Sequence, residues 1–384
     1  MNRLRSLFLP LTLACLVAPT VNATTLFVSP TGQPGAAGTA TAPLASLVEA
    51  AERAKAGDVI RLAGGTYRHD QTIHLKNNGT AAAPIRVECD DPASWPVFDF
   101  SKQEFDRNNH GIAVEGDYWH LVGLEVFQAG RFGISITGHH TVVERCRAHE
   151  NQGTGINVGA PGSHALILNC DSYRNVDRPT RGQNADGFGA KFDVGEGIVF
   201  RGCRAWENAD DGFDLWKAPH PVRIENCVAY RNGIDLWSID GYTGNGNGFK
   251  VGGDFVAAAH VIVGCIVTDQ PKNGFDQNNN AGPVLFERCT AIRCGKGFSV
   301  ILATKSGEPS VLRDNVTFDA PVVLVHGTVE ENNLWARADN AKVTATYIES
   351  MALTRTGKVP YDPAKSSGPP PRTPRTPPAK ASGN

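Results

Sequence analysis

The chain has 384 residues, which is enough for one large domain or two medium ones with a sizeable core. Its formal net charge is −2, so it lacks the basic excess that nucleic-acid-binding proteins carry. Composition and charge therefore argue against a nucleic-acid partner.

The first residues have the pattern of an export signal. A charged start at 2–5 precedes an apolar run at 7–17 and a small-residue cleavage site at 21–23. We expect a signal peptide over residues 1–23 and a secreted mature chain, extracellular or periplasmic. Cys15 also permits a lipoprotein signal, which the apolar residues after it disfavour. No later run is long enough to span a membrane, so we expect no membrane partner.

One short amphipathic helix is expected near the start, between an opening strand at 25–29 and further strands at 58–62 and 64–67. We place it over residues 43–56, with Gly57 just past its end. Its apolar face would hold Leu44, Leu47, Val48 and Ala51. This helix would cap the open end of the strands that follow.

From there the chain repeats itself with a period of about 22 to 26 residues, which is typical of stacked coils. The clearest marker is a glycine followed by an apolar residue. It recurs at Gly111, Gly133, Gly155, Gly187, Gly212, Gly248, Gly274 and Gly297. Each coil is too small to bury its own apolar side chains, so neighbouring coils must stack them into one continuous core.

Cysteine and asparagine mark a second position of the repeat. Three pairs of cysteines, Cys146/Cys170, Cys203/Cys227 and Cys265/Cys289, are each 24 residues apart. We favour a reduced, buried stack, because free cysteine packs as a small hydrophobe; disulfides within the pairs are the alternative in an exported protein. Five residues after four of these cysteines stand Asn151, Asn175, Asn208 and Asn232. These asparagines are expected to hydrogen-bond along the stack and to accept left-handed backbone.

These patterns predict an all-β chain with a single-domain right-handed parallel β-helix and a short N-terminal capping helix. A β-propeller or sandwich also has many short strands, but a period near 24 is too short for a four-stranded blade. We expect the domain to span residues 24–363, followed by a disordered Pro-rich tail at 364–384. We expect a monomer.

Three near-copies of one phrase between residues 184 and 253 carry the functional argument. They read Asn184-Ala-Asp-Gly-Phe, Ala209-Asp-Asp-Gly-Phe-Asp214 and Asn247-Gly-Phe-Lys250. Strand alternation turns the phenylalanines inward, so the residues after them form one outward column across adjacent coils about 4.8 Å apart. That column is expected to hold Ser135, Asn157, Gly189, Asp214, Lys250 and Asp276.

Four carboxylates then fall within a small volume: Asp186, Asp210, Asp211 and Asp214. Asp-Gly is a common turn dipeptide, so Asp186 or Asp211 alone would favour a turn. All four in register would repel one another, and a divalent cation would relieve that repulsion. Oxygen ligands without His or Cys favour Ca²⁺ over zinc or copper. Lys250, otherwise a solvated strand lysine, becomes a candidate base beside such a cluster.

The same phrases resemble the family 9 polysaccharide lyases, which are right-handed parallel β-helix pectate lyases. The likeness includes the opening Phe27-Val-Ser-Pro and Gly64-Gly-Thr-Tyr67, and it extends through about Phe298. The resemblance implies that the four aspartates are calcium ligands and that Lys250 is the catalytic base. It implies a secreted, calcium-dependent enzyme that cleaves α-1,4-polygalacturonate, an acidic polysaccharide, by β-elimination to 4,5-unsaturated products.

A lysine base is mostly protonated at neutral pH, so an alkaline optimum is expected. Nearby Ca²⁺ would lower the pKa of Lys250, whereas Asp214 and Asp276 would raise it.

Outward basic residues could bind substrate carboxylates, although each could equally be a solvated charge, and an outward tryptophan could stack on a sugar or pack under a loop. These candidates are Arg181, Lys191, Lys217, Lys272 and Trp216.

Three alternatives stay open at this point. A polygalacturonase-type hydrolase is also a β-helix and uses Asp residues as acid and base, but the chain lacks the Gly-His-Gly and Arg-Ile-Lys phrases of that family. A lyase on another uronate polymer would use closely related chemistry. A non-catalytic carbohydrate-binding β-helix would bind calcium only structurally and would leave Lys250 without a role.

Overall fold

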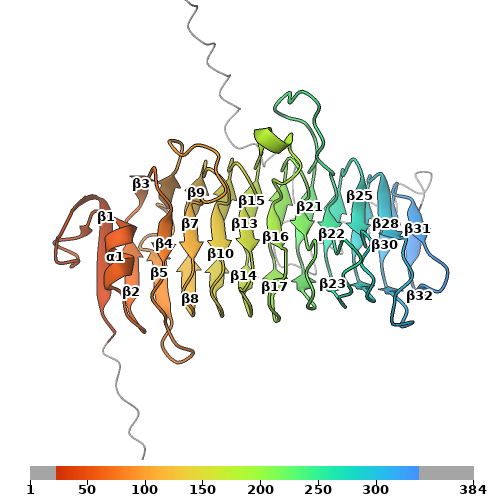
Figure 1. Ribbon diagram of the computed structural model, residues 1–384, viewed down its shortest axis with the longest axis horizontal. Helices are drawn as coiled ribbons and strands as arrows, with labels where there is room; N and C mark the ends of the chain where they lie inside the picture. Colours follow the sequence, from red (N-terminus) through yellow and green to blue (C-terminus); the bar gives the residue numbers. More distant parts are fainter. Residues whose placement is uncertain (1–22, 337–384) are drawn as a thin grey trace, which may run out of the picture.

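The computed structural model describes residues 23–336, which form one stack of short coils around a common axis (Figure 1). Each coil contributes a strand to each of three parallel sheets, so the molecule is a parallel β-helix, as predicted. Most of the predicted signal peptide (1–23), the last part of the predicted domain and the predicted tail (364–384) lie outside the described residues. No helix within residues 23–336 is long and apolar enough to cross a membrane.

The strands of the three sheets follow one another in spatial order along the stack. Sheet 1 contains β1 (Thr25–Gln33), β2 (Val59–Leu62), β5 (Ile85–Cys89), β8 (Trp119–Val122), β11 (Val142–Glu144), β14 (Leu166–Leu168), β17 (Val199–Arg201), β20 (Arg223–Glu225), β23 (Val261–Val263), β26 (Leu285–Glu287), β29 (Val311–Arg313) and β32 (Val329–Glu331). Sheet 2 contains β4 (Ile73–Leu75), β7 (Ile112–Val114), β10 (Ile134–Ile136), β13 (Ile156–Val158), β16 (Phe188–Ala190), β19 (Phe213–Asp214), β22 (Phe249–Lys250), β25 (Asn273–Asp276), β28 (Lys296–Val300) and β31 (Val322–Leu324). Sheet 3 contains β3 (Gly65–Arg68), β6 (Pro96–Asp99), β9 (Glu125–Phe127), β12 (Arg147–His149), β15 (Asp171–Tyr173), β18 (Arg204–Trp206), β21 (Val228–Tyr230), β24 (Ile266–Thr268), β27 (Thr290–Ile292), β30 (Val316–Phe318) and β33 (Leu334–Ala336).

The capping helix α1 (Leu47–Arg53) is shorter than the predicted 43–56. Ser46 is its N-cap, and its hydroxyl accepts a hydrogen bond from the Val48 amide, which fixes the start of the helix. Leu47, Ala50 and Ala51 are buried on the first coils. Val48, predicted on the apolar face, is exposed, and Leu44 is buried in the connection before the helix.

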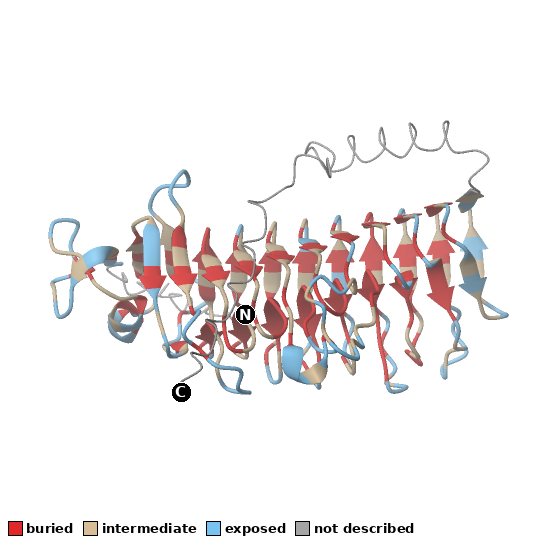
Figure 2. Cartoon of the chain, turned by 90° about the horizontal axis from the view of Figure 1, so that it is seen from above, coloured by how far each residue is buried: buried red, intermediate tan, exposed pale blue. Residues whose placement is uncertain are grey.

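Buried strand residues follow one another along the stack (Figure 2), and their inward apolar side chains form one continuous core. In sheet 2 the predicted positions after each glycine all point inward, and none is exposed. Phe188, Phe213, Phe249, Phe275 and Phe298 stack ring on ring with centroid separations of 4.8 to 4.9 Å. Such stacking is possible because the coil spacing places equivalent rings one strand apart.

Two further ladders of side chains, one of cysteines and one of asparagines, run along the stack. All eight described cysteines are free, and those of the predicted stack are buried, so the reduced stack is the arrangement that the fold adopts. The asparagine ladder is also present, since the Asn151 Nδ2 atom donates to Asn175 and the Asn175 Nδ2 atom donates to Asn208. The left-handed residue, however, is the one before each asparagine, such as Glu150 with φ 55°.

The C-terminal coils keep the regular strand pairing of the coils before them. After residue 315 the coils continue through β30, β31, β32 and β33, each paired with the coil before it. Strand β31 carries half-exposed and exposed side chains (Figure 2), because the last coils have fewer neighbours to cover them.

Candidate functional site

The predicted outward column of sheet 2 is present in full. The register pairs Ser135 with Asn157, Asn157 with Gly189, Gly189 with Asp214, Asp214 with Lys250 and Lys250 with Asp276. Strand pairing therefore makes Asp214 and Lys250 direct neighbours, as the sequence predicts. The two side chains are nevertheless buried, Asp214 at 3% and Lys250 at 9% exposure, whereas the strand pattern alone predicts solvent-facing groups.

Insertions between coils account for part of the enclosure beside this column. The connection between β21 and β22 rises above the coils next to the 3₁₀ helix η1 (Arg178–Thr180) (Figure 1). The Thr243 amide donates to the Arg181 carbonyl at 2.9 Å, and the Tyr242 hydroxyl donates to the Ala209 carbonyl. The β21–β22 connection therefore contacts, through hydrogen bonds, the segment around η1 and the residue that precedes Asp210 and Asp211 in the sequence.

A second polar column runs parallel to the first, at the position just before each glycine. The Thr154 hydroxyl donates to Asp186 at 3.0 Å, the Asp211 amide donates to Asp186 at 3.2 Å, and the Asn247 Nδ2 atom donates to Asp211 at 2.8 Å. The Asn273 Nδ2 atom in turn donates to Asn247 at 3.0 Å. This ladder fixes the orientation of the two aspartates.

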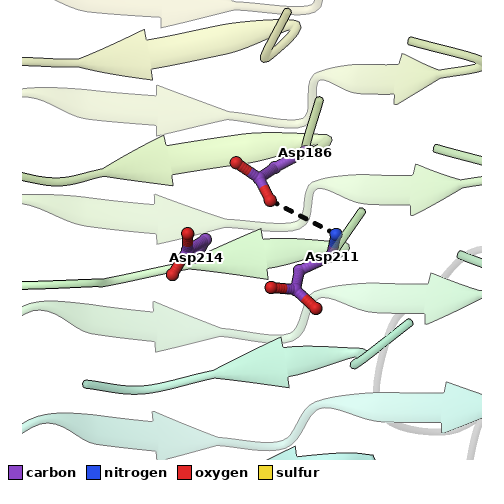
Figure 3. A group of neighbouring side chains, drawn as sticks. All are labelled: Asp186, Asp211 and Asp214. Atoms are coloured by element: carbon purple, nitrogen blue, oxygen red, sulfur yellow. Dashed lines mark hydrogen bonds between the residues drawn. The ribbon is translucent and has the colours of Figure 1, made fainter. Parts of the chain in front are cut away.

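Asp186, Asp211 and Asp214 form the acidic cluster (Figure 3). One carboxylate oxygen from each lies within 4.8 Å of the others, and all three residues are buried. The three side chains come from neighbouring coils, so the cluster exists only in the stacked protein. Asp210, predicted as a fourth ligand, is not part of this group; one of its oxygens accepts the Asn245 amide at 2.6 Å.

Burial and the charges of neighbouring aspartates raise the pKa of two carboxyls here, Asp210 and Asp211. Burial first, and then the charges of Asp214 and Asp186, raise the pKa of Asp211 to about 6, against the opposing effect of Lys250. Burial and the charges of Asp211 and Asp186 raise the pKa of Asp210 well above its usual range. One oxygen of Asp211, Oδ2, is buried and accepts no hydrogen bond of good geometry within the described residues, although the Lys250 amine lies 3.2 Å from it. The hydrogen-bonding capacity of the cluster is therefore not filled by the described residues.

Two buried lysines partly compensate the cluster. The Nζ atom of Lys250 lies 3.2 Å from Asp211 Oδ2 and 3.5 Å from Asp214 Oδ2. The Nζ atom of Lys191 lies 2.5 Å from Asp186 Oδ2 and 3.3 Å from Asp214 Oδ2. Burial lowers the pKa of both lysines, but the surrounding carboxylates outweigh it and raise both pKa values above the usual range.

Among the other predicted site residues, Trp216 contacts the cluster directly, since its backbone amide donates to Asp214 Oδ1 at 3.0 Å. The remaining side chains differ in whether they already have a partner. Arg181 is exposed at the end of η1, and the exposed Lys272 donates to Asn245 at 3.2 Å. Lys217 pairs with Asp254 at 2.5 Å and lies over the Trp216 ring. Trp216 is half-buried and packs edge-on against Phe192. Lys191, expected in the open groove, is instead inside the cluster.

Sequence reasoning missed Asn247 and Asn273 as parts of the site, and it misplaced Lys191. Asn247 and Asn273 stand directly before the Gly-Phe pair, in the same place as Asp186 and Asp211. A comparison of the repeats at that position would have found them. No pattern in the sequence indicates the direction of the Lys191 side chain.

Comparison with known proteins decides the family. Residues 26–315 match the family model described as Pel9A-like, right-handed β-helix region. The chain belongs to this family. The predicted right-handed family 9 β-helix is thereby confirmed, since the match covers most of the chain and of the described coils.

Named relatives of this Pel9A-like chain are polysaccharide lyases. It is 37% identical to pectate lyase L of Dickeya chrysanthemi over 80% of this chain and 74% of that protein. It is 33% identical to pectate lyase PEL9 of Emericella nidulans over 83% of this chain and 84% of that protein. The prediction of a polysaccharide lyase is confirmed at this level.

Solved structures agree with the family assignment. The crystal structure of pectate lyase Pel9A has a TM-score of 0.77 and 37% identity, and the match covers 81% of this chain and 79% of that one. A rhamnogalacturonan lyase has a TM-score of 0.69 and 25% identity, covering 83% and 88%. An alginate lyase from Paenibacillus, at 16% identity and a TM-score of 0.51 over 81% and 99%, shares the fold alone.

Proposed function

We propose that this chain is a secreted, calcium-dependent pectate lyase that cleaves α-1,4-polygalacturonate by β-elimination, with Lys250 as the base. The observation that carries the proposal is the position of the Lys250 amine, 3.2 Å from Asp211 and 3.5 Å from Asp214, at the edge of a buried acidic cluster. The names of the relatives support the substrate class.

The donor set fits a hard divalent cation. Asp186, Asp210, Asp211 and Asp214 carry four negative charges when ionised, and Lys191 and Lys250 carry two positive charges, which leaves a net charge of −2. One divalent cation would balance that charge. Asp186, Asp211 and Asp214 would hold it through oxygen atoms, and family resemblance adds Asp210. Oxygen donors without His or Cys favour calcium.

The chemistry at the sugar follows from this arrangement. Bound calcium supplies positive charge that neutralises the substrate carboxylate beside the C5 proton. Lys250 takes that proton, the C5–H electron pair forms the C4=C5 double bond, and the C4–O glycosidic bond breaks. The glycosidic oxygen leaves on C1 of the departing chain, where it takes up a proton and becomes a hydroxyl, and the other product has a 4,5-unsaturated end.

Lys250 must be neutral to accept the proton. Burial lowers the pKa of Lys250, but the charges of Asp214 and Asp211 outweigh burial and raise the pKa overall. The amine is therefore protonated unless another positive charge neutralises these carboxylates. A cation on the same carboxylates would offset their effect on Lys250. The reaction rate should therefore rise with pH to an alkaline optimum, and a maximum below neutrality would contradict a lysine base.

Substrate carboxylates along the groove are proposed to meet the exposed Arg181 and Lys272. Lys217 already pairs with Asp254, so it would have to exchange that partner for substrate. Trp216 packs against Phe192 and is only half-buried, which leaves part of its surface for a sugar.

The decisive experiment incubates the purified chain with polygalacturonate, with calcium or with a chelator. We expect ultraviolet absorbance of unsaturated products with calcium and none with the chelator. Reducing ends without absorbance would instead indicate a hydrolase. Absorbance only on rhamnogalacturonan or alginate would move the proposal to another uronate polymer.

Secretion is tested separately. The exported protein should start at Thr24, as measured by mass spectrometry of the culture medium and of the periplasm. Recovery of the full-length chain inside the cell would contradict this part of the proposal.

A further inference from the structure

Lys191 occupies the carboxylate oxygens that a cation in the acidic cluster would use. Its amine bridges Asp186 Oδ2 at 2.5 Å and Asp214 Oδ2 at 3.3 Å, and its side chain is 8% exposed. The amine thus lies inside the cluster and does not point to solvent as a lysine that binds substrate carboxylates would. Two adjacent carboxylates bridged by a buried ammonium are held together against their repulsion.

Because residue 189 is glycine, no side chain stands between Asn157 and Lys191. A Cβ atom at Gly189 would lie 2.5 Å from Asn157 Oδ1 and 3.3 Å from the Lys191 Cε atom. Asn157 and Lys191 therefore border the same small space. Any side chain at residue 189 would intrude on it.

Asn157 offers an acceptor in that space. It is 5% exposed, and its Oδ1 atom has no hydrogen-bond donor among residues 23–336. A buried acceptor without a donor is costly, so such groups are normally satisfied in at least one working state of a protein. The Lys191 ammonium is the cationic donor that borders the same space.

We propose that Lys191 is a resident counter-cation with two positions: on Asp186 and Asp214 before a metal ion binds, and on Asn157 Oδ1 after the ion displaces it. A divalent ion would compete with the Lys191 amine for Asp186 Oδ2 and Asp214 Oδ2 and would repel its charge. Lys250 also contacts Asp214 Oδ2, but Lys191 is the amine that has beside it an acceptor unpaired within the described residues, Asn157 Oδ1, and glycine at 189 puts no side chain between the two. Lys191 thereby lowers the affinity for the ion and keeps the carboxylates assembled without it.

This inference rests on the proposed cation site, and it gives the two buried lysines different tasks. Lys250 lies on the side of Asp211 and Asp276, one coil further along, and remains there as the base. Lys191 lies on the side of Asp186 and Gly189 and acts through the metal site, so it is a positioning residue.

The test is calcium binding measured by isothermal titration calorimetry on the purified chain. Lys191→Met keeps the length of the side chain without its charge and should lower the calcium Kd at least tenfold. Asn157→Leu removes the acceptor and should raise the Kd several-fold. In the Lys191→Met background, Asn157→Leu should have no effect, because there is no ammonium to receive. Lys76→Met, an exposed lysine on the first coils, serves as the matched control.

The outcomes separate the two proposals. If the wild-type chain binds no calcium, the cation site itself fails. If it binds calcium but folded Lys191→Met binds equally or more weakly, the two-position lysine is refuted while the cation site stands. If Lys191→Met does not fold, Asn157→Leu and Gly189→Ala in the native background decide, since unchanged affinity in both would refute the inference.

Discussion

Replacement of Lys250 by methionine is the sharpest test of the proposed mechanism. Methionine retains an unbranched side chain of similar length, so the packing beside Asp214 and Asp276 should be largely preserved. Within the described range, the only ion pair of Asp211 is with Lys250, whereas the Lys191 amine lies on Asp186 and Asp214. The variant therefore removes the one amine that Asp211 positions.

The size of the effect follows from that geometry. Loss of a positioned general base typically lowers the rate about 10²- to 10⁴-fold, which is about 3 to 5 kcal/mol of activation free energy. The formal charge of the four aspartates and two lysines changes from −2 to −3 in the variant, so calcium should bind as well as or better than in the wild-type protein.

Two measurements on the same variant separate chemistry from metal binding. Unsaturated product is followed by ultraviolet absorbance on polygalacturonate at saturating calcium, and calcium affinity is measured by calorimetry. Lys76→Met, whose side chain is 67% exposed, should match the wild-type protein in both. Retention of more than about a tenth of the wild-type rate would refute Lys250 as the base, given the loss expected for a general base.

Three further predictions concern the metal site and the core. Asp211→Asn should raise the calcium concentration needed for half-maximal rate, because a buried ligand loses its charge, while the exposed Asp70→Asn should leave it unchanged. Phe249→Ala should lower the free energy of unfolding in urea by about 3–5 kcal/mol, since the ring is fully buried between two others; an effect under 1 kcal/mol would contradict the stack. Burial lowers the pKa of His260 to about 3, so as pH falls from 6.5 to 5 only the unfolded chain gains this proton, and about 2 kcal/mol of stability should be lost. His260→Gln should flatten that slope of urea stability against pH, and an unchanged slope would exclude His260 as its source.

The inward phenylalanine stack and the outward column of sheet 2 follow the same repeat but differ in how uniform their residues are. On the inward side, every coil of sheet 2 from β16 to β28 presents a phenylalanine, so each neighbour sees the same environment and the stack is uniform. On the outward side the residues change from one coil to the next, from asparagine and glycine to aspartate and lysine. A uniform core thus holds unlike polar groups at fixed one-strand spacing.

The sequence by itself determined which residues are neighbours. In a parallel β-helix the alternation of side chains and the length of each coil fix the register, so the phrases around Phe188, Phe213 and Phe249 already place Asp214 beside Lys250. The buried phenylalanine and cysteine stacks and the asparagine ladder follow from the same periodicity. The repeat length and the strand alternation can both be read from the sequence, and together they fix which residues stack.

Only the tertiary structure decided where long side chains and irregular loops go. Lys191 turns into the acidic cluster because Asp186 and Asp214 attract its amine, and Gly189 leaves the space beside it. Asp214 and Lys250 are buried although their strand positions face outward. Rotamers of long side chains and the paths of insertions are set by contacts between distant segments, which no local period encodes.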